Sequence, residues 1–487
     1  MKILSSILIL LILTANSVYS QNSAQKAINN FVADNALQYA SVSFQVVDLS
    51  SGEIVAAHDA NRTLATASTA KLFSTATALE LLGENYRPLT RVYHDGIIDS
   101  SGVLRGNVWI RGGGDPSLGS HYYVDKAQRT LFLEKWADSL ARAGIKIIEG
   151  NIIADASEFG YEGVPDGWSW SDMGNYYGAG PSGLTIFDNM IEYAFATPSA
   201  VGREAKLASI SPEIPWLIFH NYVKSSSKSG DNVYIYGGPF DSDRFATGTL
   251  PTGQSSFVVK GSLPDPERQF AYEFERILSK KGISVRGELK TARELAVVSS
   301  TKDYEKRTLL VSHYGIPIGQ IVDKTNERSV NLFAEHLINL VGYEKTGDGS
   351  TASGLRVLEQ YWSSKFSTTA LHVNDGSGLS RSNAISAAHF TGLLSTVYKG
   401  KNGQRFYASL PVAGKSGTMR NICKGQAGDG RIAAKSGSMT RIKSYAGYVT
   451  STTGKKYAFA LIVNNQTCSS SALVDKMEVV FNAISTL

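Results

Sequence analysis

Apolar and polar positions alternate with the period of a β-strand near both ends of the chain, and each end also carries a helical stripe. Near the N-terminus, residues 25–37 predict a short amphipathic helix, followed by strands at 39–49 and 53–58. Near the C-terminus, an apolar-striped helix at 470–487 follows three strand-like runs, at 431–439, 443–450 and 456–464. The two ends therefore predict one five-stranded antiparallel sheet flanked by the terminal helices.

The middle of the chain has a different pattern, with many short β-like runs broken by Gly and Pro. Examples are 104–111, 151–154, 232–236 and 257–259. Because the predicted sheet uses both ends of the chain, this middle is expected to be an insertion rather than a tandem domain. The predicted fold class is α+β. One domain is formed by residues 21–88 plus 300–487, and residues 89–299 are expected to form two mainly β inserted domains.

The first twenty residues have the pattern of a secretory signal peptide. Lys2 is followed by an apolar run over residues 3–15 and by small residues before an expected cleavage after Ser20. No cysteine directly follows the apolar run at residues 3–15, and no later stretch approaches 18 consecutive apolar residues. The mature protein is therefore expected to be exported, periplasmic or extracellular, and soluble or peripherally associated with the envelope, without a transmembrane anchor.

Composition adds little to this picture. The chain has 487 residues, a net charge of +5 and no basic run, so nucleic-acid binding is not indicated. The two cysteines, Cys423 and Cys468, could form one disulfide in an oxidising compartment, and two buried free thiols are the alternative. The histidines form no His-Glu-x-x-His pattern, and we expect no metal or cofactor.

The first candidate for chemistry is a Ser-x-x-Lys motif, Ser68 to Lys71, at the start of an Ala- and Leu-rich helical stretch. A spacing of three puts both side chains on one face of a helix. An amine beside a hydroxyl in a partly dry site can lose its proton and act as a general base. The motif recurs by chance, and a solvated lysine on an ordinary helix is the alternative interpretation.

Two further motifs follow along the chain. Ser329 and Asn331 form Ser-x-Asn before a helix-like run, where a serine could relay a proton and an asparagine could hold a substrate amide; helix capping is the simpler interpretation. The tetrapeptide Lys435-Ser436-Gly437-Ser438 lies in a predicted strand. Its lysine and hydroxyls could take a substrate carboxylate, and its glycine would let the strand lie close to the helix of Ser68. A strand end with an exposed lysine is the alternative.

The tripeptide Lys-Ser-Gly occurs twice, so one copy must be chosen. Lys415-Ser416-Gly417 follows Leu410-Pro411-Val412-Ala413-Gly414, which has the composition of a loop, whereas Lys435 precedes two more predicted strands. The chemistry needs the copy on the strand, which favours Lys435.

Together, Ser-x-x-Lys, Ser-x-Asn and Lys-(Ser/Thr)-Gly in this order are the motifs of β-lactamases and penicillin-binding proteins. The whole mature chain resembles the multidomain class C low-molecular-mass penicillin-binding proteins, which are D-alanyl-D-alanine carboxypeptidases and endopeptidases. Further segments that carry the resemblance are Arg111–Leu118, Trp168–Tyr177, Asp375–Arg381 and Leu410–Thr418. Serine at 436 replaces the commoner threonine of the family.

The resemblance implies a β-lactamase/transpeptidase-like catalytic domain that carries inserted domains. It implies Ser68 as the acylated nucleophile and Lys71 as its base, with Ser329 and Asn331 on the second edge of the cleft. Lys435, Ser436, Gly437 and Ser438 would bind the terminal carboxylate, and Asp172 and Arg381 would lie near the substrate side chain. The expected partners are peptidoglycan stem peptides, and β-lactam antibiotics as covalent inhibitors.

Three other functions are alternatives to a carboxypeptidase or endopeptidase. A β-lactamase would need a base for deacylation, and no Glu-x-x-Leu-Asn-type segment lies between the motifs. An esterase of the same fold stays open, because the three motifs do not distinguish an amide from an ester. A non-catalytic peptidoglycan-binding protein is disfavoured by the intact set of Ser68, Lys71 and Lys435.

Overall fold

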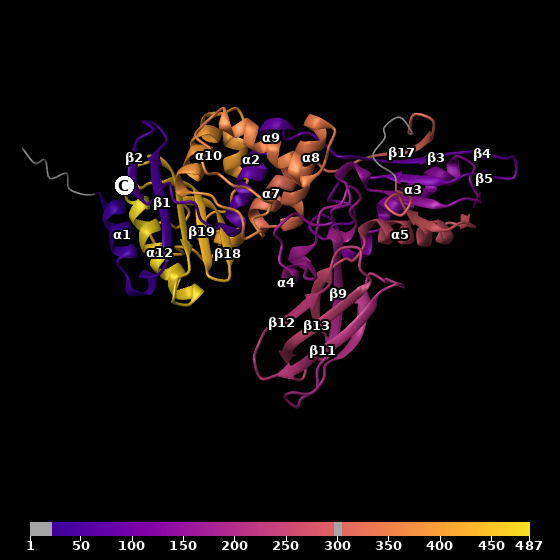
Figure 1. Cartoon of the computed structure of the whole chain (residues 1–487), viewed down its shortest axis with the longest axis horizontal. Helices are drawn as coiled ribbons and strands as arrows, with labels where there is room; N and C mark the ends of the chain where they lie inside the picture. The colour runs from indigo at the N-terminus through magenta and orange to yellow at the C-terminus, as the bar shows by residue number, and fades with distance from the viewer. Residues whose placement is uncertain (1–21, 297–303) are drawn as a thin grey trace, which may run out of the picture.

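The computed structural model describes residues 22–296 and 304–487 of the chain. The signal peptide predicted at residues 1–20 lies outside the described residues. Within the described ranges, no helix is both long and apolar enough to cross a membrane. Figure 1 shows an elongated molecule in which the first and last elements meet at one end and the middle of the chain forms the other.

The two ends of the chain form one antiparallel sheet, as the sequence predicts. Its strand order is β18-β19-β20-β1-β2, and every neighbouring pair is antiparallel. The strands are β1 (Ser41–Asp48), β2 (Ile54–His58), β18 (Ile432–Met439), β19 (Ile442–Thr450) and β20 (Lys456–Asn464). The predicted five-stranded sheet and the α+β fold class are confirmed.

Helices cover both faces of this sheet (Figure 1). On β20, Ala458, Ala460 and Ile462 pack into the core that contains α2 (Lys71–Leu81) and α10 (Ala387–Lys399). The intervening residues, among them Phe459, pack against α1 (Ser23–Val32) and α12 (Ser470–Ser485). Burial on both faces explains why the central strand is almost continuously apolar. Each fully buried side chain of the size of Ile or Phe contributes about 1.5–3 kcal/mol to the stability of the fold.

A helical layer continues from the sheet toward the inserted region. It contains α7 (Ile318–Arg328), α8 (Asn331–Thr346), α9 (Thr351–Ser363) and α11 (Gly403–Ala408). These helices pack with α2 and α10 into a single apolar core that includes Phe73, Phe333, Trp362 and Phe390. The N-terminal ends of α2 and α8 meet in this layer, and both predicted serine motifs lie there.

The inserted region is built from four small sheets with orders β10-β9-β14, β11-β13-β12, β15-β7-β5-β4 and β16-β8-β6-β3-β17. It also contains the short helix α4 (Trp170–Met173) and the longer α3 (Leu131–Arg142) and α5 (Pro266–Lys280). The strands of the two smaller sheets are β9 (Met190–Ala196), β10 (Lys206–Ser211), β11 (Ile218–Ser226), β12 (Asn232–Tyr236), β13 (Asp243–Pro251) and β14 (Phe257–Ser262). Those of the larger sheets are β3 (Leu89–His94), β4 (Ile97–Ile98), β5 (Val103–Arg105), β6 (Val108–Arg111), β7 (Ile147–Ile148), β8 (Ile152–Asp155), β15 (Ser284–Val285), β16 (Leu289–Thr291) and β17 (Thr308–Tyr314).

One pairing bears on the predicted domain boundary at residue 300. Strand β17 pairs antiparallel with β3, which places residues 308–314 in a sheet of the inserted region. This pairing favours a return to the catalytic domain after Tyr314. The division at 88/89 and 299/300, and the number of inserted domains, remain predictions.

The structure does not contain the disulfide that was considered for Cys423 and Cys468, because both are free thiols. Cys423 is buried beside the middle of α12, where burial, Glu478 and Asp429 raise the pKa of its thiol to about 12. Cys468 immediately precedes Ser469, the N-cap of that helix. At a rise of 1.5 Å per residue, Glu478 lies roughly 13 Å along the helix from Ser469, so the two thiols lie beside different parts of α12.

Candidate active site

Ser68 lies in the short 3-10 helix η2 (Ala67–Ala70), which leads directly into α2. Ala67 has a φ of 47°, a left-handed conformation that L-residues with a side chain seldom adopt. Two glycines allow the backbone around the serine to pack closely. An added Cβ on Gly378 would overlap the carbonyl oxygen of Ala67, and one on Gly437 would overlap that of Thr66. Strain and close packing thus fix the position of Ser68.

Lys71 is fully buried, and its amine is surrounded by three polar atoms. Its Nζ lies 2.9 Å from Ser68 Oγ, 2.5 Å from Asn331 Oδ1 and 2.6 Å from the carbonyl oxygen of Ser377. A neutral amine has two N–H bonds and one lone pair. If the N–H bonds are donated to Asn331 and Ser377, the lone pair is left to accept the proton of the Ser68 hydroxyl.

The charge state of Lys71 is set by its surroundings. Burial lowers the pKa of Lys71 from 10.5 to about 7, although the nearby carboxyl groups of Asp375 and Glu335 act in the opposite direction. Glu335 is itself fully buried, and burial together with Asp375 raises its pKa to about 8. A lysine with a pKa near neutrality is suited to take up and return a proton at physiological pH.

The carbonyl of Ser377 is held in place by a network that the sequence analysis did not identify. Glu335, on α8, accepts hydrogen bonds from the N–H groups of Gly376 and Ser377, both at 2.8 Å. The buried Asp375 carboxylate accepts from five groups: the N–H groups of Gly378 and Ser380, the hydroxyl of Ser377, the indole of Trp168 and the side chain of Asn383. The sequence marks Asp375–Arg381 only as a segment that resembles the family, and within it the resemblance implies a role for Arg381 alone.

Ser329 and Asn331 lie at the junction of α7 and α8. Ser329 ends α7 in a left-handed conformation with φ 60°, and Asn331 begins α8. The Asn331 side chain donates to the Tyr177 carbonyl at 2.7 Å while its Oδ1 faces Lys71. The junction therefore joins the nucleophile helix to the Trp168–Tyr177 segment of the inserted region.

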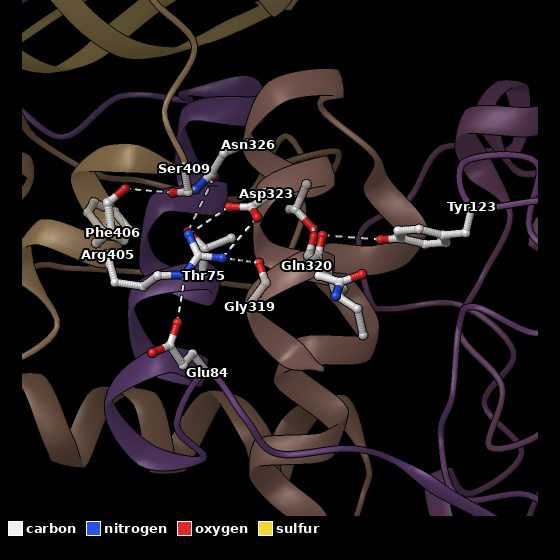
Figure 2. A network of polar contacts seen from close by, with 12 residues as sticks. Thr75, Glu84, Tyr123, Gly319, Gln320, Asp323, Asn326, Arg405, Phe406 and Ser409 are labelled. Atoms are coloured by element: carbon white, nitrogen blue, oxygen red, sulfur yellow. Dashed lines mark hydrogen bonds and ion pairs between the residues drawn. The ribbon is translucent and has the colours of Figure 1, made fainter. Parts of the chain in front are cut away.

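A network of hydrogen bonds and ion pairs holds α7 against α11 and α2 (Figure 2). Arg405, on α11, forms a bidentate ion pair with Asp323 and donates to the Gly319 carbonyl. Asn326 donates to Ser409 at 2.8 Å, and its Oδ1 lies 3.4 Å from Thr75 on α2. Bidentate guanidinium–carboxylate pairs fix orientation as well as distance, so this network helps to set where Ser329 lies.

Lys435 lies on β18, the edge strand of the sheet, and is fully buried. Its Nζ lies 2.9 Å from Ser329 Oγ and 2.7 Å from the Ser436 carbonyl. Burial, together with the charges of Lys71 and Lys443, lowers the pKa of Lys435 well below 10.5. The loop at 411–413 pairs with the first part of the β18 edge, and Ser438 and Met439 at the end of this strand line the cleft.

The other residues of the Lys435 tetrapeptide take different positions. Ser438 is exposed and lines the cleft, whereas Ser436 is half-buried and donates a hydrogen bond to Thr418 at 2.8 Å. An added Cβ on Gly437 would lie 3.0 Å from the backbone nitrogen of Ser68, so this glycine brings the strand close to the nucleophile, as its position in the motif predicts.

A cleft of about 400 Å³ opens over Ser68 and collects most of the predicted site residues. Its walls include Ser68, Asp172, Ser329, Asn331, Arg381 and Ser438, together with Tyr176, Tyr177 and Tyr234. Burial raises the pKa of the half-buried Asp172, although Tyr177 donates to it at 3.3 Å and Arg381 lies near enough to attract it. In the described part of the chain, no group of His, Cys, Asp and Glu side chains is arranged to hold a metal ion.

The fold and this cluster define a class of protein: an active-site-serine enzyme of the penicillin-recognising type. The family model described as "D-Ala-D-Ala carboxypeptidase 3 (S13) family" matches residues 24–484. The chain therefore belongs to this family of serine-type D-alanyl-D-alanine carboxypeptidases, the class C low-molecular-mass penicillin-binding proteins. The resemblance and the enzyme class predicted from the motifs are confirmed.

Individual relatives agree with this assignment. A D-alanyl-D-alanine carboxypeptidase of an Actinomadura strain is 29% identical over 450 residues, which cover 90% of this chain and 80% of the relative. The D-alanyl-D-alanine carboxypeptidase DacB of Haemophilus influenzae is 24% identical over 434 residues, covering 87% and 85%. The crystal structure of penicillin-binding protein 4 from Haemophilus influenzae superposes with a TM-score of 0.82 at 20% identity, covering 94% of this chain and 99% of that one, which shows a shared fold.

Proposed function

We propose that this protein cleaves the D-alanyl-D-alanine ends or cross-links of peptidoglycan through an acyl-enzyme on Ser68. The single observation that carries this proposal is the arrangement around Lys71. Its amine has a pKa of about 7, lies 2.9 Å from Ser68 Oγ and has hydrogen-bond acceptors for both of its N–H bonds. This arrangement supports the transfer of the Ser68 proton to Lys71 as Oγ attacks the substrate carbonyl.

The oxyanion formed by this attack needs donors near Ser68. The Ser68 N–H lies in the first turn of a helix, where backbone N–H groups have no intrahelical partner. The Ser438 N–H, on the edge strand that passes close to Ser68, is the second proposed donor. Two such donors, aimed at the developing charge, are the usual source of a large part of catalysis in acyl transfer.

Collapse of this intermediate breaks the amide bond and leaves the acyl group on Ser68 Oγ. The departing amine takes the proton held by Lys71, and Ser329, which lines the same cleft as Ser68, is proposed to relay it. Water then attacks the ester carbonyl and gives a proton to Lys71. The bond between the acyl group and Ser68 Oγ breaks, Lys71 returns the proton to Oγ, and the shortened peptide leaves as its carboxylate. Lys435, Ser436 and Ser438 are proposed to bind the terminal carboxylate, and a bound carboxylate would favour the charged form of Lys435.

Asp172 and Arg381 are proposed to contact the side chain of the stem residue that precedes D-alanyl-D-alanine. Both line the cleft, and Asp172 lies at its half-buried wall beside Tyr177. A free ammonium on this stem residue would pair with the Asp172 carboxylate. Partial burial would make such a charge-assisted pair stronger than an exposed one.

The same carboxylate grip is proposed to bind β-lactams, whose ring would open on Ser68 to give a covalent adduct. Export of the protein is likewise proposed from residues 1–20, and the purified mature protein is then expected to begin at Gln21.

Incubation of the purified protein with a defined stem pentapeptide tests the proposed reaction. We expect mass spectrometry to show the tetrapeptide and free D-alanine with wild-type protein and no product with Ser68→Ala. Circular dichroism of the variant checks that it is folded. Product formation by a folded Ser68→Ala variant would refute the proposed nucleophile.

A further inference from the structure

The small sheet β11-β13-β12 in the inserted region has one buried face and one exposed face. Val223, Val233, Ile235, Ala246 and Leu250 point into the core of the inserted region. The alternate positions along the same strands point to solvent, as expected for a sheet that is covered on one side. At these exposed positions the chain places aromatic rings, which burial in this core does not explain.

The exposed rings form two rows across the strands. Strand pairing places His220, Phe245 and Tyr236 side by side in one row. The next row on the same face, two residues away along each strand, consists of Tyr222, Thr247 and Tyr234. His220 stacks on Phe245, with ring centroids 4.6 Å apart and planes 11° apart. Tyr222 and Tyr234 are 59% and 49% exposed.

The exposed Trp170, on α4, extends this surface, since its ring centroid lies 6.3 Å from that of Tyr236. We call the set the aromatic face; it consists of Trp170, His220, Tyr222, Tyr234, Tyr236 and Phe245. Figure 1 shows β11, β13 and β12 extending away from the catalytic sheet, with α4 between them and the rest of the molecule.

The aromatic face is continuous with the catalytic cleft. Tyr234 lines the cleft that contains Ser68, and it also lines an adjoining pocket of about 270 Å³ along the edge of β12. Tyr176 and Tyr177 line both cavities as well. Asn175 holds this junction together, because its Oδ1 accepts from the Ile235 N–H at 3.1 Å. A molecule bound over Ser68 can therefore extend past Tyr234 onto the aromatic face.

We propose that the aromatic face binds the glycan strand of peptidoglycan, the polymer of amino sugars that carries the stem peptides. This inference rests on the proposed function. In peptidoglycan the amino end of each stem peptide is joined to a sugar, so a stem held in the cleft brings glycan with it. The aromatic face would bind that glycan and present its stem peptides to Ser68.

The chemistry of the aromatic face fits a sugar polymer. The face of an aromatic ring carries negative charge density, which attracts the weakly positive C–H groups on the flat side of a pyranose ring. Polar groups lie among the rings and can bond to sugar hydroxyls, including the His220–Asp243 pair at 2.7 Å, Thr247 and Lys224. In these three fully described strands, Ile218 is the one large aliphatic side chain that is exposed, whereas a lipid surface would favour several.

Binding to peptide-free glycan tests this proposal. The probe is immobilised chains of N-acetylglucosamine and N-acetylmuramic acid from which an amidase has removed the peptides, measured by biolayer interferometry. The double variant Tyr222→Ala/Phe245→Ala removes one ring from each row and leaves the cleft residues unchanged. We expect it to bind these chains at least about tenfold more weakly than wild type, since two ring contacts are lost.

Two matched variants and one second reaction complete the test. Tyr39→Ala removes a tyrosine elsewhere that is even more exposed, and it is expected to bind as wild type. Tyr222→Phe/Phe245→Tyr keeps both rings and should retain most binding. Acylation by benzylpenicillin, which has no glycan, should be unchanged in all variants and reports on folding and on the proposed function separately. The proposal is overturned if wild type does not bind the peptide-free chains, or if the double variant binds them as well as wild type. It is also overturned if the aromatic face is required for binding to phosphatidylglycerol vesicles and not to glycan.

Discussion

The chain contains the tripeptide Lys-Ser-Gly twice, and the two copies have opposite environments. Lys435 is fully buried on an edge strand, with Ser329 Oγ 2.9 Å from its amine. The side chain of Lys415 is 61% exposed and forms an ion pair with Asp429 at 2.8 Å. The same three residues thus provide a desolvated amine beside Ser329 in one place and a solvated surface charge in the other.

This difference shows that the sheet, rather than the tripeptide, gives Lys435 its buried position beside Ser329. The strand alternation of β18 directs Lys435 inward, and the position of β18 at the sheet edge places it beside the cleft. The loop copy is not without a structural use, since Thr418, which follows it, accepts a hydrogen bond from Ser436. It therefore supports the strand copy and does not compete with it.

Replacing each lysine in turn gives the largest expected contrast. Lys435→Ala should slow acylation by benzylpenicillin at least about 100-fold, because a charged contact to the substrate carboxylate is lost in a dry site. Lys415→Ala should stay within about twofold of wild type, because exposed ion pairs contribute little. Stopped-flow acylation rates measure both. The reverse ranking would show that the loop copy is the functional one.

Gly437→Ala tests whether the strand must lie close to the nucleophile. The added methyl would overlap the Thr66 carbonyl oxygen and lie 3.0 Å from the Ser68 nitrogen, so the strand must move away. Acylation should slow at least about tenfold, since small displacements of reacting groups are costly. Gly238→Ala, where the added carbon would meet only the Trp170 ring at 3.8 Å, is the control for a glycine replacement that requires no movement of the backbone. An unchanged rate in Gly437→Ala would mean that close approach is not needed.

The pH dependence of acylation tests Lys71, whose charge also helps to lower the pKa of Lys435. Lys71 must be neutral to accept a proton, and burial lowers its pKa to about 7. Its neutral fraction, and with it the acylation rate, should rise about tenfold between about pH 6 and pH 8. Lys415→Ala should show the same midpoint as wild type. A rate that is flat over this range would argue against Lys71 as the base.

Asp172→Ala gives the smallest expected effect on a residue that lines the cleft. Cleavage of a stem peptide with a free side-chain ammonium should slow about three- to tenfold, because Asp172 is only half-buried. Acylation by benzylpenicillin, which lacks that ammonium, should change far less. Comparison of kcat/KM for the two substrates decides the matter. Equal losses would indicate a structural role.

Much of the fold and site was predictable because their signals are local. The strands at both ends are marked by apolar runs and turns, and the three motifs are marked by residue spacing. In the structure, up to 367 positions of chain separate residues that lie in one cluster: Ser68, Lys71, Ser329, Asn331 and Lys435. The distances between their polar atoms could not be predicted from the spacing of the motifs.

Other features depend on contacts that no local pattern encodes. The Ser377 carbonyl takes part through a backbone atom, and the buried Glu335 and Asp375 that position it resemble ordinary helix and loop acids in the sequence. An oxidising compartment would permit one disulfide between the two cysteines, yet both are free thiols and lie beside different parts of α12. The aromatic face arises only when three strands align in register.

The most direct test of the account is to identify the residue that benzylpenicillin acylates. The purified protein is labelled, digested with protease and analysed by tandem mass spectrometry. The account predicts a single penicilloyl adduct on Ser68 in wild type and in Lys415→Ala, much slower formation of that adduct in Lys435→Ala, and none in Ser68→Ala. An adduct on any other serine, such as Ser416 in the loop copy, would contradict it.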